Sequence, residues 1–101
     1  NGYLCDTHTA SGWAVAEDYV NQTGDKRPMV VLSTASPYKF PAAVLRAIGE
    51  TAKGDEFDQL EQLHAVTNVP IPKNLADLRT KPERHTGVID METMLDFVLA
   101  L

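Results

Sequence analysis

The sequence has few of the residues that hold metals or close disulfides. Its 101 residues include one cysteine, Cys5, and three histidines, which lie far apart and lack the spacing of a zinc site. One cysteine forms no intramolecular disulfide, which fits a reducing compartment, so we expect a cytoplasmic protein. The chain has no glycine-rich phosphate loop of the GxxxxGK type and no GxGxxG motif. The common signatures of metal and nucleotide chemistry are therefore missing.

The chain also lacks clustered basic residues and a long apolar run. Nine Lys and Arg against fourteen Asp and Glu give a net charge of -5, and the basic residues are scattered. Because binding to a phosphate backbone depends on clustered Lys and Arg, we expect no nucleic-acid and no membrane partner. The apolar runs are far shorter than the roughly 20 residues that cross a bilayer. The chain starts with Asn1 and shows no secretory signal, so we expect one globular domain cut from a longer polypeptide.

The first third of the chain predicts a helix followed by a strand. Apolar residues recur at spacings of three and four over residues 9–22, which predicts an amphipathic helix. Asp6, Thr7 and Thr9 each offer a side-chain oxygen for its N-terminal cap, and Gly24 is suited to end it. Residues 29–32 form a continuous apolar run, which predicts a strand covered on both faces. Since one strand forms no sheet, its neighbours are expected in residues 2–5 or outside this sequence.

The rest of the chain is predicted to be helical. Pro41 suits the first position of a helix that fades by Gly54, and Asp55 can cap the next one. Asn74 is expected to cap a short helical turn. Asp90 is expected to cap a last helix, whose apolar residues follow the spacing i, i+3, i+4, i+7. The predicted fold class is therefore α/β, rich in helix and with one strand.

One candidate functional motif is DTHTA at residues 6–10. Asp6 and His8 lie two residues apart where a helix is expected to start, and there a carboxylate can orient an imidazole for acid–base chemistry. The alternative is that Asp6 caps the helix and His8 is a polar residue of its first turn. On the sequence alone the cap is the favoured interpretation, and the spacing by itself does not decide between the two.

A second candidate motif, LSTASPYKF at residues 32–40, follows the predicted strand. Ser33, Thr34 and Ser36 place three hydroxyls where open α/β sheets bind ligands, outside the carboxyl ends of their strands. A hydroxyl suits a heteroaromatic nitrogen or a phosphate oxygen, but in a turn it also bonds its own backbone. Lys39 lies beside the next helix start and can meet an anion, although exposed lysines more commonly pack their stems. Both interpretations stay open at this point.

Together, the two motifs resemble the C-terminal part of bacterial threonine synthase. Many members of that family carry DPHTA where this chain has DTHTA, and STAHPAKF where it has STASPYKF at residues 33–40. The chain departs from these patterns at Thr7, Ser36 and Tyr38, and it matches them at Thr34 and Lys39. The similarity extends over nearly the whole chain. Residues 1–101 are therefore expected to form a single C-terminal fragment of such an enzyme.

The resemblance implies an enzyme of fold type II that depends on pyridoxal 5'-phosphate (PLP). Such a threonine synthase converts O-phospho-L-homoserine and water into L-threonine and phosphate, and the predicted strand would join the sheet of its cofactor domain. A Ser or Thr near the C-terminal end commonly hydrogen-bonds the pyridine nitrogen, which assigns Thr34, and next Ser33, to cofactor binding. Asp6, His8 and Lys39 would shape the pocket or meet the substrate.

The resemblance also implies that the catalytic N-terminal portion is absent from these 101 residues. The Schiff-base lysine and the loop that grips the cofactor phosphate belong to the family's earlier sequence, and no stretch of this chain resembles either. The fragment alone is therefore expected to be inactive, and its uncovered helix faces to self-associate. Two alternatives are another fold-type-II lyase, such as a dehydratase, and a non-catalytic interaction domain.

Overall fold

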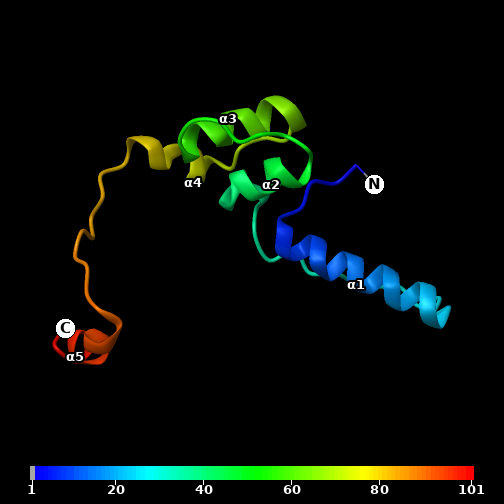
Figure 1. Ribbon diagram of the computed structural model, residues 1–101, viewed down its shortest axis with the longest axis horizontal. Helices are drawn as coiled ribbons and strands as arrows, with labels where there is room; N and C mark the ends of the chain where they lie inside the picture. The colour runs from blue at the N-terminus through cyan, green and yellow to red at the C-terminus, as the bar shows by residue number, and fades with distance from the viewer. Residues whose placement is uncertain (1) are drawn as a thin grey trace.

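The computed structural model describes residues 2–101 and consists of helices joined by extended segments (Figure 1). The α-helices are α1 (Thr7–Thr23), α2 (Pro41–Ala47), α3 (Glu56–Thr67), α4 (Lys73–Ala76) and α5 (Met94–Leu99). Short 3-10 helices are η1 (Pro37–Lys39), η2 (Asp77–Thr80) and η3 (Met91–Thr93). The radius of gyration is 18.6 Å, whereas a compact domain of this length has a value of about 13 Å. The chain is thus elongated, with α1 and α5 extending away from a small centre.

The predicted α/β fold is wrong, because residues 2–101 contain no strand. Residues 29–32 are extended but pair with no neighbouring strand, and residues 2–5 form none either. An apolar, β-branched run has the propensity for a strand, but a sheet also needs a partner that completes its hydrogen bonds. The segment lies beside α1 instead, where it shares a shallow groove with Gly12, Val15 and Tyr19. The prediction of a strand that joins a sheet therefore fails, and the fold is helical.

The predicted first helix is confirmed, and it begins two residues earlier than the apolar pattern alone suggests. Asp6 is its N-cap, and the Asp6 side chain accepts hydrogen bonds from the backbone of the first turn. Gly24 ends the helix with a left-handed φ of 68°, and its N–H donates to the carbonyl of Val20 at 2.8 Å. Both ends are thus set by residues whose chemistry is local.

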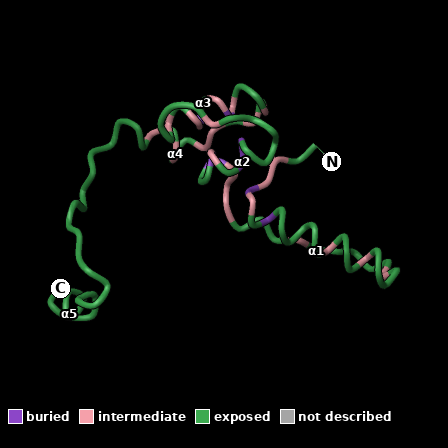
Figure 2. The backbone as a smooth tube through the Cα atoms, viewed as in Figure 1, coloured by how far each residue is buried: buried purple, intermediate pink, exposed green. Residues whose placement is uncertain are grey.

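The core lies between α2 and α3 (Figure 2). Leu45 and Leu63 are completely buried there, and the other buried apolar side chains are Tyr38, Val44 and Leu60. The helix starts expected at Pro41 and after Asp55 are confirmed, and Asp55 forms a reciprocal capping box with Asp58. The short helix α4 begins at Lys73 after Pro72, so Asn74 lies inside it and is not its cap. A small set of side chains therefore holds the centre together.

The C-terminal end lies apart from this core. Residues 81–90 are extended and exposed, and they lead to η3 and α5 at the far end of the molecule (Figures 1 and 2). The last helix was expected from its apolar spacing, and α5 confirms it, but it begins at Met94, so the prediction that Asp90 caps it is wrong: Asp90 precedes η3, and its side chain accepts no capping hydrogen bond. The apolar side chains of η3 and α5 are exposed, Met91 at 86% and Leu95 at 67%. Among residues 2–101, no helix combines the length and the apolar content that a membrane span requires.

Candidate functional site

The DTHTA motif forms the first turn of α1, and its carboxylate is used as the cap. The Asp6 side chain is completely buried. Its Oδ1 accepts hydrogen bonds from the N–H of His8 at 2.9 Å and from the N–H of Thr9 at 3.2 Å, and its Oδ2 accepts one from the Thr9 hydroxyl. The hydrogen bond from the Thr9 hydroxyl lowers the pKa of Asp6 despite the opposing effect of burial. Asp6 is therefore an ionised carboxylate at neutral pH whose partners lie within its own turn.

His8 and Lys39 meet at the ring of Phe40. The His8 ring lies 5.9 Å from the Phe40 ring, centroid to centroid, and is tilted by 57°. The Lys39 Nζ lies 5.7 Å from the same Phe40 centroid, within the range of a cation–π contact. Both polar side chains are exposed. The two sequence motifs, which are separated by the rest of α1 and the extended segment after it, thus come together around one aromatic ring.

A pocket of about 350 Å³ also joins the two motifs. It lies between the N-terminal segment, the first turns of α1 and the extended residues after α1. Its lining residues are Tyr3, Cys5, Thr9, Ala10, Trp13, Val31 and Ser33. This volume is at the lower end of the range for small-molecule sites. The pocket is therefore lined by Ser33, the second choice for the cofactor hydroxyl, and by Thr9, which Asp6 holds in place, whereas the first choice, Thr34, is not among its lining residues.

The three hydroxyls of the second motif differ in their roles. Ser36 caps η1, since its hydroxyl accepts a hydrogen bond from the N–H of Tyr38 at 3.2 Å. Ser33 and Thr34 are exposed, and neither side chain hydrogen-bonds to any residue within the described range 2–101. Two of the three hydroxyls are thus available to a ligand, while the third is committed to the local turn.

Residues 9–98 match the family described as "Threonine synthase, C-terminal". The chain belongs to this threonine synthase C-terminal family. The match contains the whole second motif, and Asp6 and His8 lie just before its first residue. Searches among curated proteins and among solved structures returned no match. The family match therefore includes the second motif and the last two residues of the first. It confirms the resemblance to threonine synthase at the level of the family.

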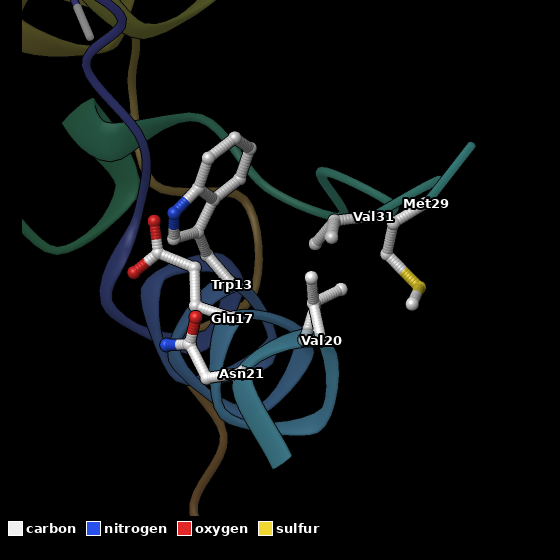
Figure 3. Close-up of a pocket in the computed structure, with 7 residues that line it drawn as sticks. Trp13, Glu17, Val20, Asn21, Met29 and Val31 are labelled. Atoms are coloured by element: carbon white, nitrogen blue, oxygen red, sulfur yellow. The ribbon is translucent and has the colours of Figure 1, made fainter. Parts of the chain in front are cut away.

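A second pocket in this threonine synthase C-terminal chain measures about 340 Å³ (Figure 3). Figure 3 shows the Glu17 carboxylate and the Asn21 amide on one side, and the apolar side chains Val20, Met29 and Val31 on the other. Trp13 and Val31 line both pockets. Within residues 2–101, no group of His, Cys, Asp and Glu side chains is arranged to hold a metal ion. Polar side chains in this second pocket come only from α1.

Two aromatic residues of the site were not predicted from the sequence. Phe40 is the ring that His8 and Lys39 share, and Trp13 lines both pockets. Phe40 directly follows Lys39 in the second motif, so its position in the sequence could have identified it as a candidate site residue. Trp13 was predicted only as part of the apolar stripe of a helix, yet it is 47% exposed and faces the pockets. The contacts that bring these rings to the motifs are between distant segments, and periodicity does not reveal them.

Proposed function

We propose that this chain is the C-terminal part of a threonine synthase that uses PLP to convert O-phospho-L-homoserine and water into L-threonine and phosphate. The observation that carries the proposal is the family match over residues 9–98. The meeting of the two motifs around Phe40 and around one pocket supports it, because functional side chains from distant segments gather there. The catalytic N-terminal portion, with the Schiff-base lysine, belongs to other sequence of the parent protein.

The available residues fit one edge of the cofactor and not its phosphate. Thr34 and Ser33 carry exposed hydroxyls without a partner among residues 2–101, and a hydroxyl can donate to or accept from a pyridine nitrogen. The N-terminus of α1 is a poor phosphate site, because the Asp6 carboxylate already occupies its N–H groups. Bound PLP supplies an electron sink for the reaction, and a neutral hydroxyl partner leaves its ring nitrogen less firmly protonated. Thr34 thus holds the ring, and Ser33 assists it.

The cluster at Phe40 suits the substrate. O-phosphohomoserine is anionic, and Lys39 is a cation whose Nζ lies 5.7 Å from the Phe40 centroid, with the His8 imidazole beside the same ring. Because a phosphate accepts hydrogen bonds from both donor types, these two side chains attract and orient the substrate. Asp6 shapes the pocket indirectly, because its carboxylate accepts the hydrogen bond of the Thr9 hydroxyl and Thr9 lines the pocket.

Replacing Thr34 with valine in the full-length parent tests the proposal. Valine keeps the size of the side chain but removes the hydroxyl, so the affinity for PLP and the rate of phosphate release are expected to fall roughly tenfold. Absorbance of the bound cofactor and released phosphate are the measurements. Thr34→Ser keeps the hydroxyl and should remain close to the wild type. A parent that binds no PLP and releases no phosphate from phosphohomoserine refutes the proposal.

The same assay separates the synthase from the dehydratase alternative. A dehydratase releases ammonia from a hydroxyamino acid, whereas the synthase releases phosphate from a phosphorylated one. The family match supports the synthase. Ammonia release from threonine or serine, without phosphate release from phosphohomoserine, would favour the dehydratase.

The isolated 101-residue chain is proposed to self-associate through its C-terminal helix. Leu95, Val98 and Leu99 of α5 are 67%, 55% and 75% exposed, and exposed apolar patches promote association. Sedimentation velocity is expected to show dimers or larger species whose fraction rises with concentration. Leu95→Lys should return the chain to a monomer, while Asp96→Lys, on the same helix, should not. A monomer at every concentration would contradict this prediction.

A further inference from the structure

Tyr38 is the only buried residue of the second motif, residues 33–40. Its side chain is 2% exposed and packs in the core with Val44, Leu45 and Leu63. Its hydroxyl donates a hydrogen bond to the carbonyl of Val69, a residue 31 positions further along the chain. The motif that carries the candidate ring contact is therefore fixed to the turn that follows α3.

A second side chain holds the same carbonyl. The Nδ1 atom of His64 lies 2.8 Å from the Val69 oxygen, and because a carbonyl only accepts, Nδ1 carries the proton. Asn68 ends α3 with a left-handed φ of 60°, and the N–H of Val69 donates to the Thr67 hydroxyl at 3.4 Å. The acceptor of the Tyr38 hydroxyl thus has His64 as a second donor, and the N–H of the same residue, Val69, is also hydrogen-bonded.

The segment between Thr34 and Tyr38 is short and constrained. The Ser36 hydroxyl accepts from the N–H of Tyr38 at 3.2 Å, and the Ser36 carbonyl accepts from the N–H of Lys39 at 3.0 Å. Pro37 has a restricted φ. On the other side of Thr34, the apolar run is largely uncovered, with Leu32 76% exposed, and no strand among residues 2–101 pairs with it. Tyr38 is therefore the buried anchor of the motif that carries Thr34.

We infer that Tyr38 is the positioning residue of the cofactor-ring contact: its hydroxyl, fixed on the Val69 carbonyl, holds the Thr34 hydroxyl in place for the pyridine nitrogen. This inference rests on the proposed function, which assigns Thr34 to the ring. Tyr38 touches neither cofactor nor substrate and acts through Thr34. In Tyr38→Phe the ring still fills the core, but the bond to Val69 is lost and the loop that carries Thr34 is less well held.

A double-mutant cycle in the full-length holoenzyme tests the inference. Thr34→Val, Tyr38→Phe and the double variant are compared by titration with PLP and by the pH dependence of the bound cofactor's visible absorbance. Tyr38→Phe is expected to weaken PLP binding roughly three- to fivefold in the wild type and not at all in the Thr34→Val background. It should also shift the absorbance profile in the same direction as Thr34→Val. A structural role alone would weaken binding equally in both backgrounds.

Tyr19→Phe is the matched control. It removes a hydroxyl that donates to Asp25 Oδ2 at 3.1 Å on the exposed end of α1, so PLP binding should stay unchanged. If Thr34→Val weakens PLP binding but Tyr38→Phe has no effect, or adds fully to Thr34→Val, the inference fails while the proposed function stands. If Thr34→Val itself leaves PLP binding and the absorbance profile unchanged, the proposed ring contact fails, and the assignment of Tyr38 fails with it.

Discussion

Replacing Leu63 with alanine is expected to lower the free energy of unfolding of the 101-residue chain by about 3 kcal/mol. Leu63 on α3 is completely buried, as is Leu45 on α2. Leu→Ala in a core loses the transfer free energy of the removed atoms and leaves a cavity. The fully buried core is small, since among residues 2–101 it contains Tyr38, Val44, Leu45, Leu60 and Leu63, and the apolar side chains packed around it, such as Phe57 and Ile71, are only partly buried. A change of this size is a large share of the stability of a small domain.

Urea unfolding followed by far-ultraviolet circular dichroism measures the effect. Val66→Ala is the matched control, because Val66 lies on the same helix but is 48% exposed and should change the stability by less than about 0.5 kcal/mol. Since Tyr38 packs in the same core, Leu63→Ala should also loosen the loop that carries Thr34. Equal losses in the two variants would mean that α2 and α3 do not form the stabilising core.

The helix ends could be predicted from the sequence because they depend on neighbouring residues. Asp6 and Asp55 accept hydrogen bonds from N–H groups two or three positions ahead, and Gly24 needs only its own left-handed conformation. Each of these interactions is local, so the residue types at the right spacing are sufficient. Asn74 was a suitable cap by residue type, but Pro72 fixes the start of α4 two residues earlier.

The strand could not be predicted correctly, because pairing is not local. Residues 29–32 have the apolar, β-branched composition of a buried strand, yet no segment among residues 2–101 pairs with them. The composition of a segment indicates whether it can form a strand, but it does not indicate whether a neighbouring strand is present to pair with it. The same limit applies to α5, whose apolar spacing correctly predicts a helix but not the exposure of its apolar side chains.

The sequence predicted several residues of the candidate site but not the contacts between them. The two motifs supplied His8, Ser33, Thr34 and Lys39, and the structure brings His8 to Lys39 through Phe40. The role of Thr34 in cofactor binding stays a prediction. The link from Tyr38 to Val69 spans 31 positions and involves a backbone carbonyl, which leaves no trace in residue types. Family motifs therefore indicate which residues belong to the site, whereas the contacts that hold those residues in place are found only in the structure.

Replacing Asp6 with alanine is expected to unravel the start of α1. The variant removes the acceptor of the N–H groups of His8 and Thr9, and it leaves the buried Thr9 hydroxyl without its partner. Loss of an N-cap together with an unpaired buried hydroxyl should speed amide hydrogen exchange in the first turn roughly 10- to 100-fold. Asp18→Ala, on an exposed position of the same helix, is the control and should leave exchange in that turn unchanged.

Acid titration separates the charge of Asp6 from its hydrogen bonds. The Thr9 hydroxyl lowers the pKa of Asp6 below the ordinary value of 3.8, so the native state favours the ionised form more than the unfolded chain does. The contribution of the carboxylate to stability is therefore complete above the ordinary value and is lost as the pH falls through the lower native pKa. Asp6→Asn keeps an oxygen acceptor but cannot titrate, so its first turn should fray equally above and below that range. If the wild type and Asp6→Asn respond identically to acid, the stabilising feature of the cap is the oxygen acceptor and not its charge.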